Sequence, residues 1–277
     1  MGYSQTKVDK WQPGEPLSVS FYSEDSKVKG VFYPAVGAGP FPAVILSHGY
    51  PGNNKDVLGL GQRFMKEGIH ALAFNYRGSW RSEGLYTLRN SLRDVRSAIE
   101  YLKSPSMVER FSIDVTNIAI AGYSFGGGMA LLGSLYDSSV RKVVDVAGMD
   151  LCELARQVKK DDRVREALEK TLEEGMSTTG MIRSHGVKGG IEELLETMDE
   201  YDLVKHAEEL AEKNLLLIAG WQDNQVTLEA NILPLYRALQ KCGAKNVEIE
   251  VFNSHHQFTN VRDALASRII SWIKKKQ

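Results

Sequence analysis

A serine stands between two glycines in the run 122–126, Gly-Tyr-Ser-Phe-Gly, which has the pattern G-x-S-x-G. The apolar residues 117–121 precede this run, and small and apolar residues at 127–132 follow it. A strand, a tight turn and a helix in this order would hold the serine at the apex of the turn in a strained backbone conformation. We therefore interpret Ser124 as a nucleophile. The alternative is a glycine-rich turn whose serine only caps the next helix.

A serine hydroxyl becomes reactive when a neighbouring base takes its proton, and an acid must orient that base. Of the six histidines, only His255 and His256 follow the end of a predicted strand late in the chain. That position suits the chain order serine, acid, histidine. We expect His256 to be the base, because the apolar Phe258 two residues later would anchor its loop. His255 is the alternative base.

The acid is expected in the loop that follows the predicted strand 214–219. This loop supplies Asp223, and Gly220 allows the chain to turn sharply out of the strand. The alternative role for Asp223 is an interaction with the N-terminus of a helix that is predicted to begin at Val226. The two roles are compatible, and we expect Asp223 to orient the histidine.

Acyl transfer also requires N–H donors for the negatively charged oxygen that develops in the transition state. The backbone N–H of Phe125 directly follows the serine, and the loop after the predicted strand 43–46 should supply a second donor. We expect this donor to be the N–H of Tyr50. His48, in the same loop, is interpreted as a structural histidine. Arg77 is expected to brace neighbouring loops and to have no catalytic role.

The elements that would position these residues can be predicted from the apolar patterns. Residues 17–23 and 28–33 alternate as an antiparallel hairpin at a sheet edge. Further strands are predicted at 43–46, 71–75, 117–121, 142–146, 214–219 and 247–252. Helical spacing is found at 59–68, 88–102, 125–135, 226–240 and 260–274. The alternation predicts an α/β fold, with an eight-stranded, mostly parallel sheet that helices cover on both faces.

The segment 149–213 interrupts this alternation. It is heavily charged, lacks a convincing strand, and has helical patterns at 151–159, 162–173, 190–198 and 203–211. Because it follows a strand whose carboxyl end should face the site, we expect a helical cap insertion. The core would then comprise residues 1–148 and 214–277. The alternative is a solvated helical excursion with no role at the site.

Composition narrows the classes of function. The chain has 277 residues, with 34 basic and 35 acidic residues, and this balance does not favour nucleic acid as a partner. No apolar run reaches the length of about 18 residues that a membrane span requires. Cys152 and Cys242 fit no metal or disulfide pattern, which favours a reducing, cytoplasmic location. Nucleotide and zinc motifs are absent, so we expect neither a cofactor nor a metal.

Together these residues resemble the α/β-hydrolase superfamily. The matching segments are 48–49, 77–84, 122–126, 220–223 and 256–258, which follow the order of that family. The chain is most similar to serine esterases near the dienelactone-hydrolase, cinnamoyl-esterase and prolyl-oligopeptidase-like groups. It differs from dienelactone hydrolases in having Ser124 where they carry cysteine. It also lacks the propeller domain of oligopeptidases, which disfavours a peptidase.

The residues and the resemblance predict a carboxylesterase-type serine hydrolase. It would act on short-chain or aryl esters through an acyl-enzyme formed on Ser124, with Asp223 and His256 completing the triad. The alternatives are a peptidase, an amidase or an acyltransferase on the same triad, and a homologue that binds a ligand without turnover. The expected partner is a small-molecule ester. The oligomeric state stays open, with a homodimer as one alternative.

Overall fold

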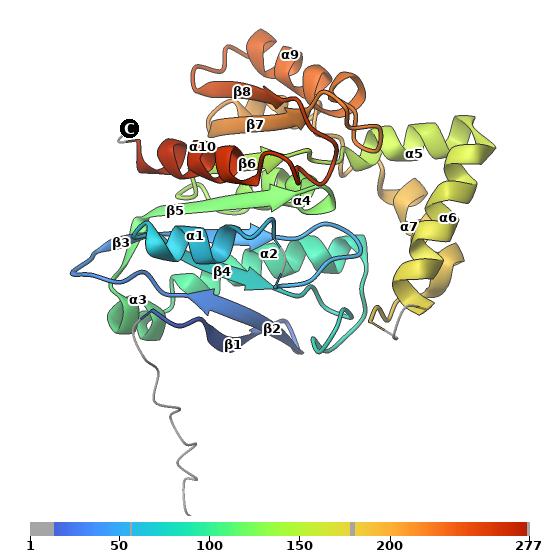
Figure 1. Cartoon of the computed structure of the whole chain (residues 1–277). Coiled ribbons are helices and arrows are strands. Elements are labelled where there is room, and N and C mark those ends of the chain that lie inside the picture. Colours follow the sequence, from blue (N-terminus) through green and yellow to red (C-terminus); the bar gives the residue numbers. More distant parts are fainter. Residues whose placement is uncertain (1–13, 56, 178–180, 276–277) are drawn as a thin grey trace, which may run out of the picture.

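The computed structural model describes residues 14–55, 57–177 and 181–275, and within them the chain forms one eight-stranded sheet (Figure 1). The strand order is β1-β2-β4-β3-β5-β6-β7-β8. The strands are β1 (Leu17–Ser23), β2 (Ser26–Tyr33), β3 (Phe41–Ser47), β4 (His70–Phe74), β5 (Ile113–Tyr123), β6 (Lys142–Val146), β7 (Asn214–Gly220) and β8 (Val247–Phe252).

The sheet is mostly parallel. β1 and β2 pair antiparallel as the predicted hairpin, and β2 pairs antiparallel with β4. All other neighbouring strands run parallel, so their carboxyl ends meet at one edge. Every residue of β4 and β6 is buried, as expected of strands that helices cover on both faces. The predicted fold class is confirmed.

Helices cover both faces of the sheet (Figure 1). One face is covered by α1 (Leu60–Lys66) and α10 (Arg262–Lys274). The other face is covered by α2 (Leu88–Leu102), α3 (Pro105–Phe111), α4 (Phe125–Ser134) and α9 (Leu233–Lys241). A π-helical turn, η1 (Leu228–Ile232), leads into α9. Over the described ranges of the chain, none of the helices has both the length and the apolar character that crossing a membrane requires.

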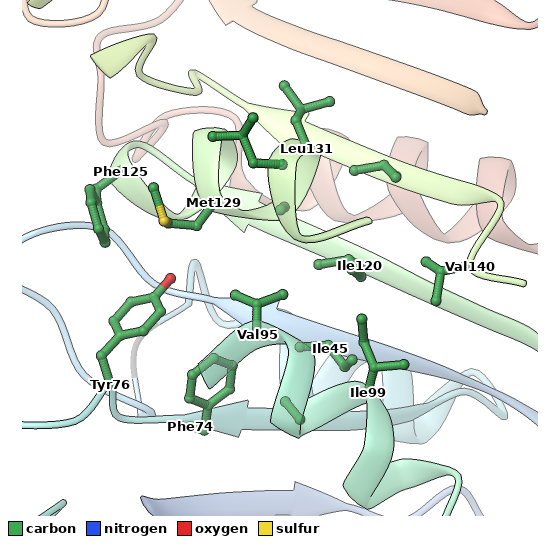
Figure 2. Close-up of a cluster of buried hydrophobic side chains, with 14 of the residues drawn as sticks. Ile45, Phe74, Tyr76, Val95, Ile99, Ile120, Phe125, Met129, Leu131 and Val140 are labelled. Carbon is green, nitrogen blue, oxygen red and sulfur yellow. The ribbon is translucent and has the colours of Figure 1, made fainter. Parts of the chain in front are cut away.

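Figure 2 shows part of the larger hydrophobic cluster, between the sheet and helices α2 and α4. Val95 of α2, Ile45 of β3 and Met129 of α4 are all fully buried in it. The cluster continues to the rings of Tyr76 and Phe125, whose centroids lie 5.6 Å apart at an interplanar angle of 79°. Full burial of one such large apolar side chain stabilises the fold by about 1.5–3 kcal/mol. The core therefore reaches the turn that carries Ser124.

The chain between β6 and β7 is helical. It forms α5 (Leu151–Lys160), α6 (Asp162–Ser177), α7 (Gly186–Thr197) and α8 (Ala207–Leu210). In Figure 1, α5, α6 and α7 lie together beyond the arrowheads of the parallel strands, at the right of the view. Buried apolar side chains of α5, α7 and α8 belong to the same hydrophobic cluster as α2 and α4. The predicted boundaries of a separate cap stay a prediction.

Three elements differ clearly from those expected. The helix predicted at 203–211 is reduced to the four residues of α8, because residues 203–206 form turns. The sequence pattern did not indicate α3, and the helix expected to begin at Val226 begins two residues later as η1. At that point the Asp223 side chain accepts hydrogen bonds from the backbone N–H groups of Gln225 and Val226, at 2.9 Å each. Thr227 then has an extended backbone and caps η1, so the helical backbone begins only at Leu228.

Candidate active site

Ser124 occupies the turn between β5 and α4 with φ 56° and ψ −125°, outside the conformations that L residues usually adopt. The glycines around it allow backbones to approach closely. A Cβ added at Gly122 would lie 1.9 Å from the Gly126 carbonyl oxygen, and one at Gly126 would lie 2.2 Å from the Ser47 carbonyl oxygen. Strand, turn and helix therefore pack as the G-x-S-x-G pattern predicts.

Three side chains from distant parts of the chain meet at this turn. Nδ1 of His256 lies 2.7 Å from Oδ2 of Asp223, and Nε2 of His256 lies 2.9 Å from Oγ of Ser124. Because an ionised carboxylate only accepts hydrogen bonds, the Nδ1–H donates to Asp223, and Nε2 is left to accept the serine proton. The Asp223 side chain is fully buried and that of His256 is 7% exposed. Burial strengthens both interactions, since water screens them little.

The two oxygens of Asp223 have different partners. Oδ2 faces His256, whereas Oδ1 accepts the two backbone N–H groups of its own turn. Oδ1 thus stabilises the turn that precedes η1, whereas the N-terminus of η1 is capped by Thr227 and not by Asp223. Gly220 lets the loops after β7 and β8 approach each other, because a Cβ there would lie 2.5 Å from the Ser254 carbonyl oxygen.

The structure separates the two adjacent histidines. His256 is buried, whereas His255 is exposed, with its Nδ1 at 3.2 Å from the Gln222 carbonyl oxygen. Phe258 is fully buried and anchors the loop below them. The ring of Tyr123 packs on the His256 ring at 5.0 Å between centroids. This contact could not be predicted from the sequence, because Tyr123 occupies a variable position of the G-x-S-x-G pattern.

Phe125 directly follows the serine, and the loop that carries Tyr50 contacts it. A Cβ added at Gly49 would be 3.0 Å from Cβ of Ser124, so the loop after β3 contacts the nucleophile. Phe125 is the first residue of α4, where a backbone N–H has no acceptor within the helix. The Ser124 carbonyl oxygen accepts hydrogen bonds from the N–H of Gly127 at 2.8 Å and of Met149 at 3.1 Å. These bonds fix the peptide that carries the Phe125 N–H.

His48 shapes the loop that contains Tyr50. Its Nδ1–H donates to the Gly49 carbonyl oxygen at 2.7 Å, and its ring packs edge-on against Tyr76. Burial lowers the pKa of His48 to about 4, so the ring is neutral at physiological pH. These contacts agree with a structural histidine.

Arg77 connects three segments near the site. Its Nε donates to Asp94 on α2 at 2.6 Å, and its Nη1 donates to Glu24 in the β1–β2 turn at 2.6 Å. Its backbone N–H donates to the other oxygen of Asp94. Trp80 in the following loop donates its Nε1–H to the Gly52 carbonyl oxygen at 2.7 Å. Arg77 therefore joins the loop after β4 to α2 and to the β1–β2 turn, whereas the bond of Trp80 joins that loop to the loop after β3.

A cavity of about 920 Å³ opens onto Ser124 and His256. Its inner wall is aromatic, with Tyr50, Tyr86 and Phe125. Its outer wall is formed by α5, α6 and α7, which contribute Leu151, Leu154, Val164, Ala167, Leu168, Leu172 and Leu194. A second cavity of about 260 Å³ lies beside β3 and α1 and includes no residue of the triad. The larger cavity can hold an apolar or aromatic ligand next to the serine.

One buried acid near the turn was not expected. The side chain of Asp145 on β6 lies between the backbones of Gly127 and Gly148, where added Cβ atoms would be 2.3 Å and 1.9 Å from its Oδ1. Burial raises the pKa of Asp145 to about 8, against a smaller opposite effect of the Gly148 N–H. A lone aspartate within an apolar strand gives no sequence signal for this position, because the apolar pattern does not show that its side chain lies between the backbones of Gly127 and Gly148.

The fold, together with the serine, histidine and aspartate in this order and geometry, defines an α/β-hydrolase. The model of the BD-FAE family matches residues 30–184, which is more than half of the chain. The chain belongs to this family.

Individual relatives agree with this assignment. The chain is 32% identical to the quorum-quenching protein AidA of Acinetobacter baumannii over 149 residues, which cover 52% of this chain and 46% of AidA. The match thus spans about half the length of this curated relative. The esterase Pf2001 of Pyrococcus furiosus is 21% identical with a TM-score of 0.67, covering 96% of this chain and 95% of its own. Est1E of Butyrivibrio proteoclasticus is 15% identical with a TM-score of 0.67, covering 92% and 97%.

Proposed function

We propose that this protein is a serine hydrolase that cleaves carboxylic esters through an acyl-enzyme on Ser124. The observation that carries the proposal is the pair of hydrogen-bond distances at His256, 2.9 Å to Ser124 Oγ and 2.7 Å to the buried Asp223. A neutral imidazole held between a hydroxyl and a carboxylate can accept the serine proton and is stabilised when it becomes charged.

The reaction proceeds in two acyl transfers. Oγ of Ser124 attacks the ester carbonyl carbon while Nε2 of His256 takes the hydroxyl proton. The carbonyl electron pair moves to the oxygen, which the N–H groups of Tyr50 and Phe125 hold. The intermediate collapses, the C–O bond breaks, and His256 returns its proton to the leaving alcohol. Water then attacks the acyl-enzyme as His256 takes its proton, and the carboxylic acid leaves with Ser124 restored.

The cavity supports esters with an apolar or aryl group. Three aromatic rings lie on its inner wall, and aliphatic side chains of α5, α6 and α7 lie opposite. Because these helices contribute the outer wall, we propose that residues 149–213 act as the cap that selects the substrate. Short-chain and aryl esters fit such a cavity, and its volume leaves room for longer acyl groups.

The first test measures hydrolysis of p-nitrophenyl butyrate and labelling by a fluorophosphonate probe. The purified protein should hydrolyse the ester and be labelled at Ser124. Ser124→Ala should abolish labelling and lower kcat by on the order of 10⁴–10⁶-fold, as found for catalytic serines in general. A variant that retains the wild-type rate would refute the mechanism.

The second test identifies the base and the reaction class. His256→Ala should lose several orders of magnitude in kcat, whereas His255→Ala, the adjacent control, should retain most of it. A panel of esters, aminoacyl arylamides and hydroxycinnamates, with and without an alcohol acceptor, should show faster turnover of the esters. Faster release of the arylamides, or transfer to the acceptor in preference to water, would assign an amidase or an acyltransferase instead.

A further inference from the structure

Tyr50 connects the loop beside the serine to helix α6. Its backbone lies in the loop that contacts Ser124, while its phenol reaches α6 and donates a hydrogen bond to the Leu172 carbonyl oxygen at 3.2 Å. The ring also packs against Tyr86 at 5.3 Å between centroids, and Tyr86 packs against Phe125 at 5.9 Å. One residue thus contacts both the catalytic turn and the outer wall of the cavity.

Gly175 provides the seat for this phenol. It is the buried residue of α6, whose other described positions are all at least partly exposed. A Cβ added at Gly175 would lie 2.4 Å from the Tyr50 hydroxyl oxygen and 2.8 Å from its Cζ. Glycine is a poor helix former, so its presence within α6 is explained by this close contact rather than by the helix.

The same part of α6 faces the substrate cavity. Leu168, Thr171 and Leu172 line that cavity, and Leu172 is also the residue whose carbonyl holds Tyr50. Burial raises the pKa of the Tyr50 phenol to about 12, so the hydroxyl stays a neutral donor at physiological pH. A ligand in the cavity that contacts this turn of α6 therefore contacts Leu172, the residue whose carbonyl binds Tyr50 in the loop beside Ser124.

We propose that Tyr50 is a positioning residue whose phenol, seated on Gly175 and bonded to Leu172, sets the placement of its own backbone N–H at the oxyanion. This inference rests on the proposed function and deepens it. Substrate that fills the cavity under α6 would hold the donor in place, and the rate of acyl transfer would depend on how well the acyl group contacts α6. Esters with larger acyl groups would then show a higher kcat as well as a lower KM.

The test replaces Gly175 by alanine, whose Cβ would occupy the space of the Tyr50 hydroxyl. Gly175→Ala should displace the phenol and lower kcat for p-nitrophenyl butyrate at least tenfold, with little change in KM, because removal of one oxyanion donor typically costs about 10²–10³ in rate. Glu173→Ala, an exposed position on the same helix, is the matched control and should retain the wild-type kcat. Gly175→Ala with wild-type kcat would overturn the proposal.

A double variant separates positioning from a general loss of structure. Tyr50→Phe loses the hydrogen bond to Leu172 and should itself lower kcat. Because both substitutions disturb the same contact, Gly175→Ala combined with Tyr50→Phe should lower kcat little further than Gly175→Ala alone. A merely structural defect in α6 would leave the two losses additive, and that result would also overturn the proposal. If the wild-type protein hydrolyses no ester and takes up no fluorophosphonate, the proposed function fails and this inference fails with it. An active wild type with additive losses refutes the inference alone.

Discussion

At the scale of a single residue, the buried carboxyl of Asp145 makes the free energy of unfolding depend on pH. Its pKa rises from the ordinary value of 3.8 to about 8 in the folded chain, because burial disfavours the charged form. The folded state therefore keeps a proton that the unfolded state releases. This contribution to stability is fully present below about pH 4, declines as the pH rises to about 8, and is constant above that.

Asp145→Asn should remove this pH dependence, since asparagine has nearly the same shape and carries no charge. We expect the variant to gain stability relative to the wild type as the pH rises from 5 to 8, by up to about 1.4 kcal/mol per pH unit. Urea unfolding at a series of pH values measures the difference. Asp25→Asn, at an exposed turn, is the control and should give a curve parallel to the wild type. Parallel curves for Asp145→Asn would show that this carboxyl titrates normally.

The residues that the sequence indicated share one property. Ser124, Asp223 and His256 each follow the end of a strand, so the order of elements was enough to place them near one another. Asp145 and Tyr123 could not be recognised in this way. Their environments depend on contacts with Gly127 and His256, which only the folded sheet brings close to them.

At the scale of elements, the strands were predictable because burial on both faces leaves continuous apolar runs. The short helix α3 was not predictable, since its seven residues span only two turns and show little periodicity. The start of η1 was misplaced because Asp223 holds residues 223–226 in a turn and Thr227 stays extended, so that the helical backbone begins at Leu228. The apolar spacing alone does not reveal such a turn.

Helix α6 should control the acyl-chain preference. It presents Val164, Leu168 and Leu172 to the cavity at a spacing of four residues, which places them on one face. Leu168→Trp would fill part of the cavity, so we expect kcat/KM for p-nitrophenyl octanoate to fall at least tenfold, and that for the acetate to fall less. Leu168→Met, which conserves volume, is the control. A parallel fall for both esters would show that the acyl chain does not reach α6.

At the scale of the whole molecule, the helical segment between β6 and β7 is continuous with the core. Its buried side chains join the hydrophobic cluster that also contains the sheet, α2 and α4. An ion pair also stabilises this segment internally: Nη2 of the partly exposed Arg156 lies 2.7 Å from Oδ2 of the buried Asp202. A shared core implies shared cooperativity, so this segment should not melt before the sheet.

Calorimetry should therefore show a single unfolding transition, with equal calorimetric and van't Hoff enthalpies. Leu210→Ala, a fully buried position on α8, should lower the stability of the whole chain by about 2–5 kcal/mol and shift that one transition to lower temperature. Circular dichroism of the same variant provides the comparison. Two resolved transitions would mean that α5 to α8 unfold independently of the sheet.

The position of β8 at the edge of the sheet has a consequence for biosynthesis. Ser124 and His256 are separated by 132 residues, and the loop that carries His256 is placed only when β8 pairs with β7. A ribosome makes the chain from its N-terminus, so β1 to β7 and the serine turn emerge before the histidine exists. The nascent chain can thus acquire most of its core while its serine still lacks the histidine. In the proposed mechanism, the serine would become reactive only once the last strand has paired.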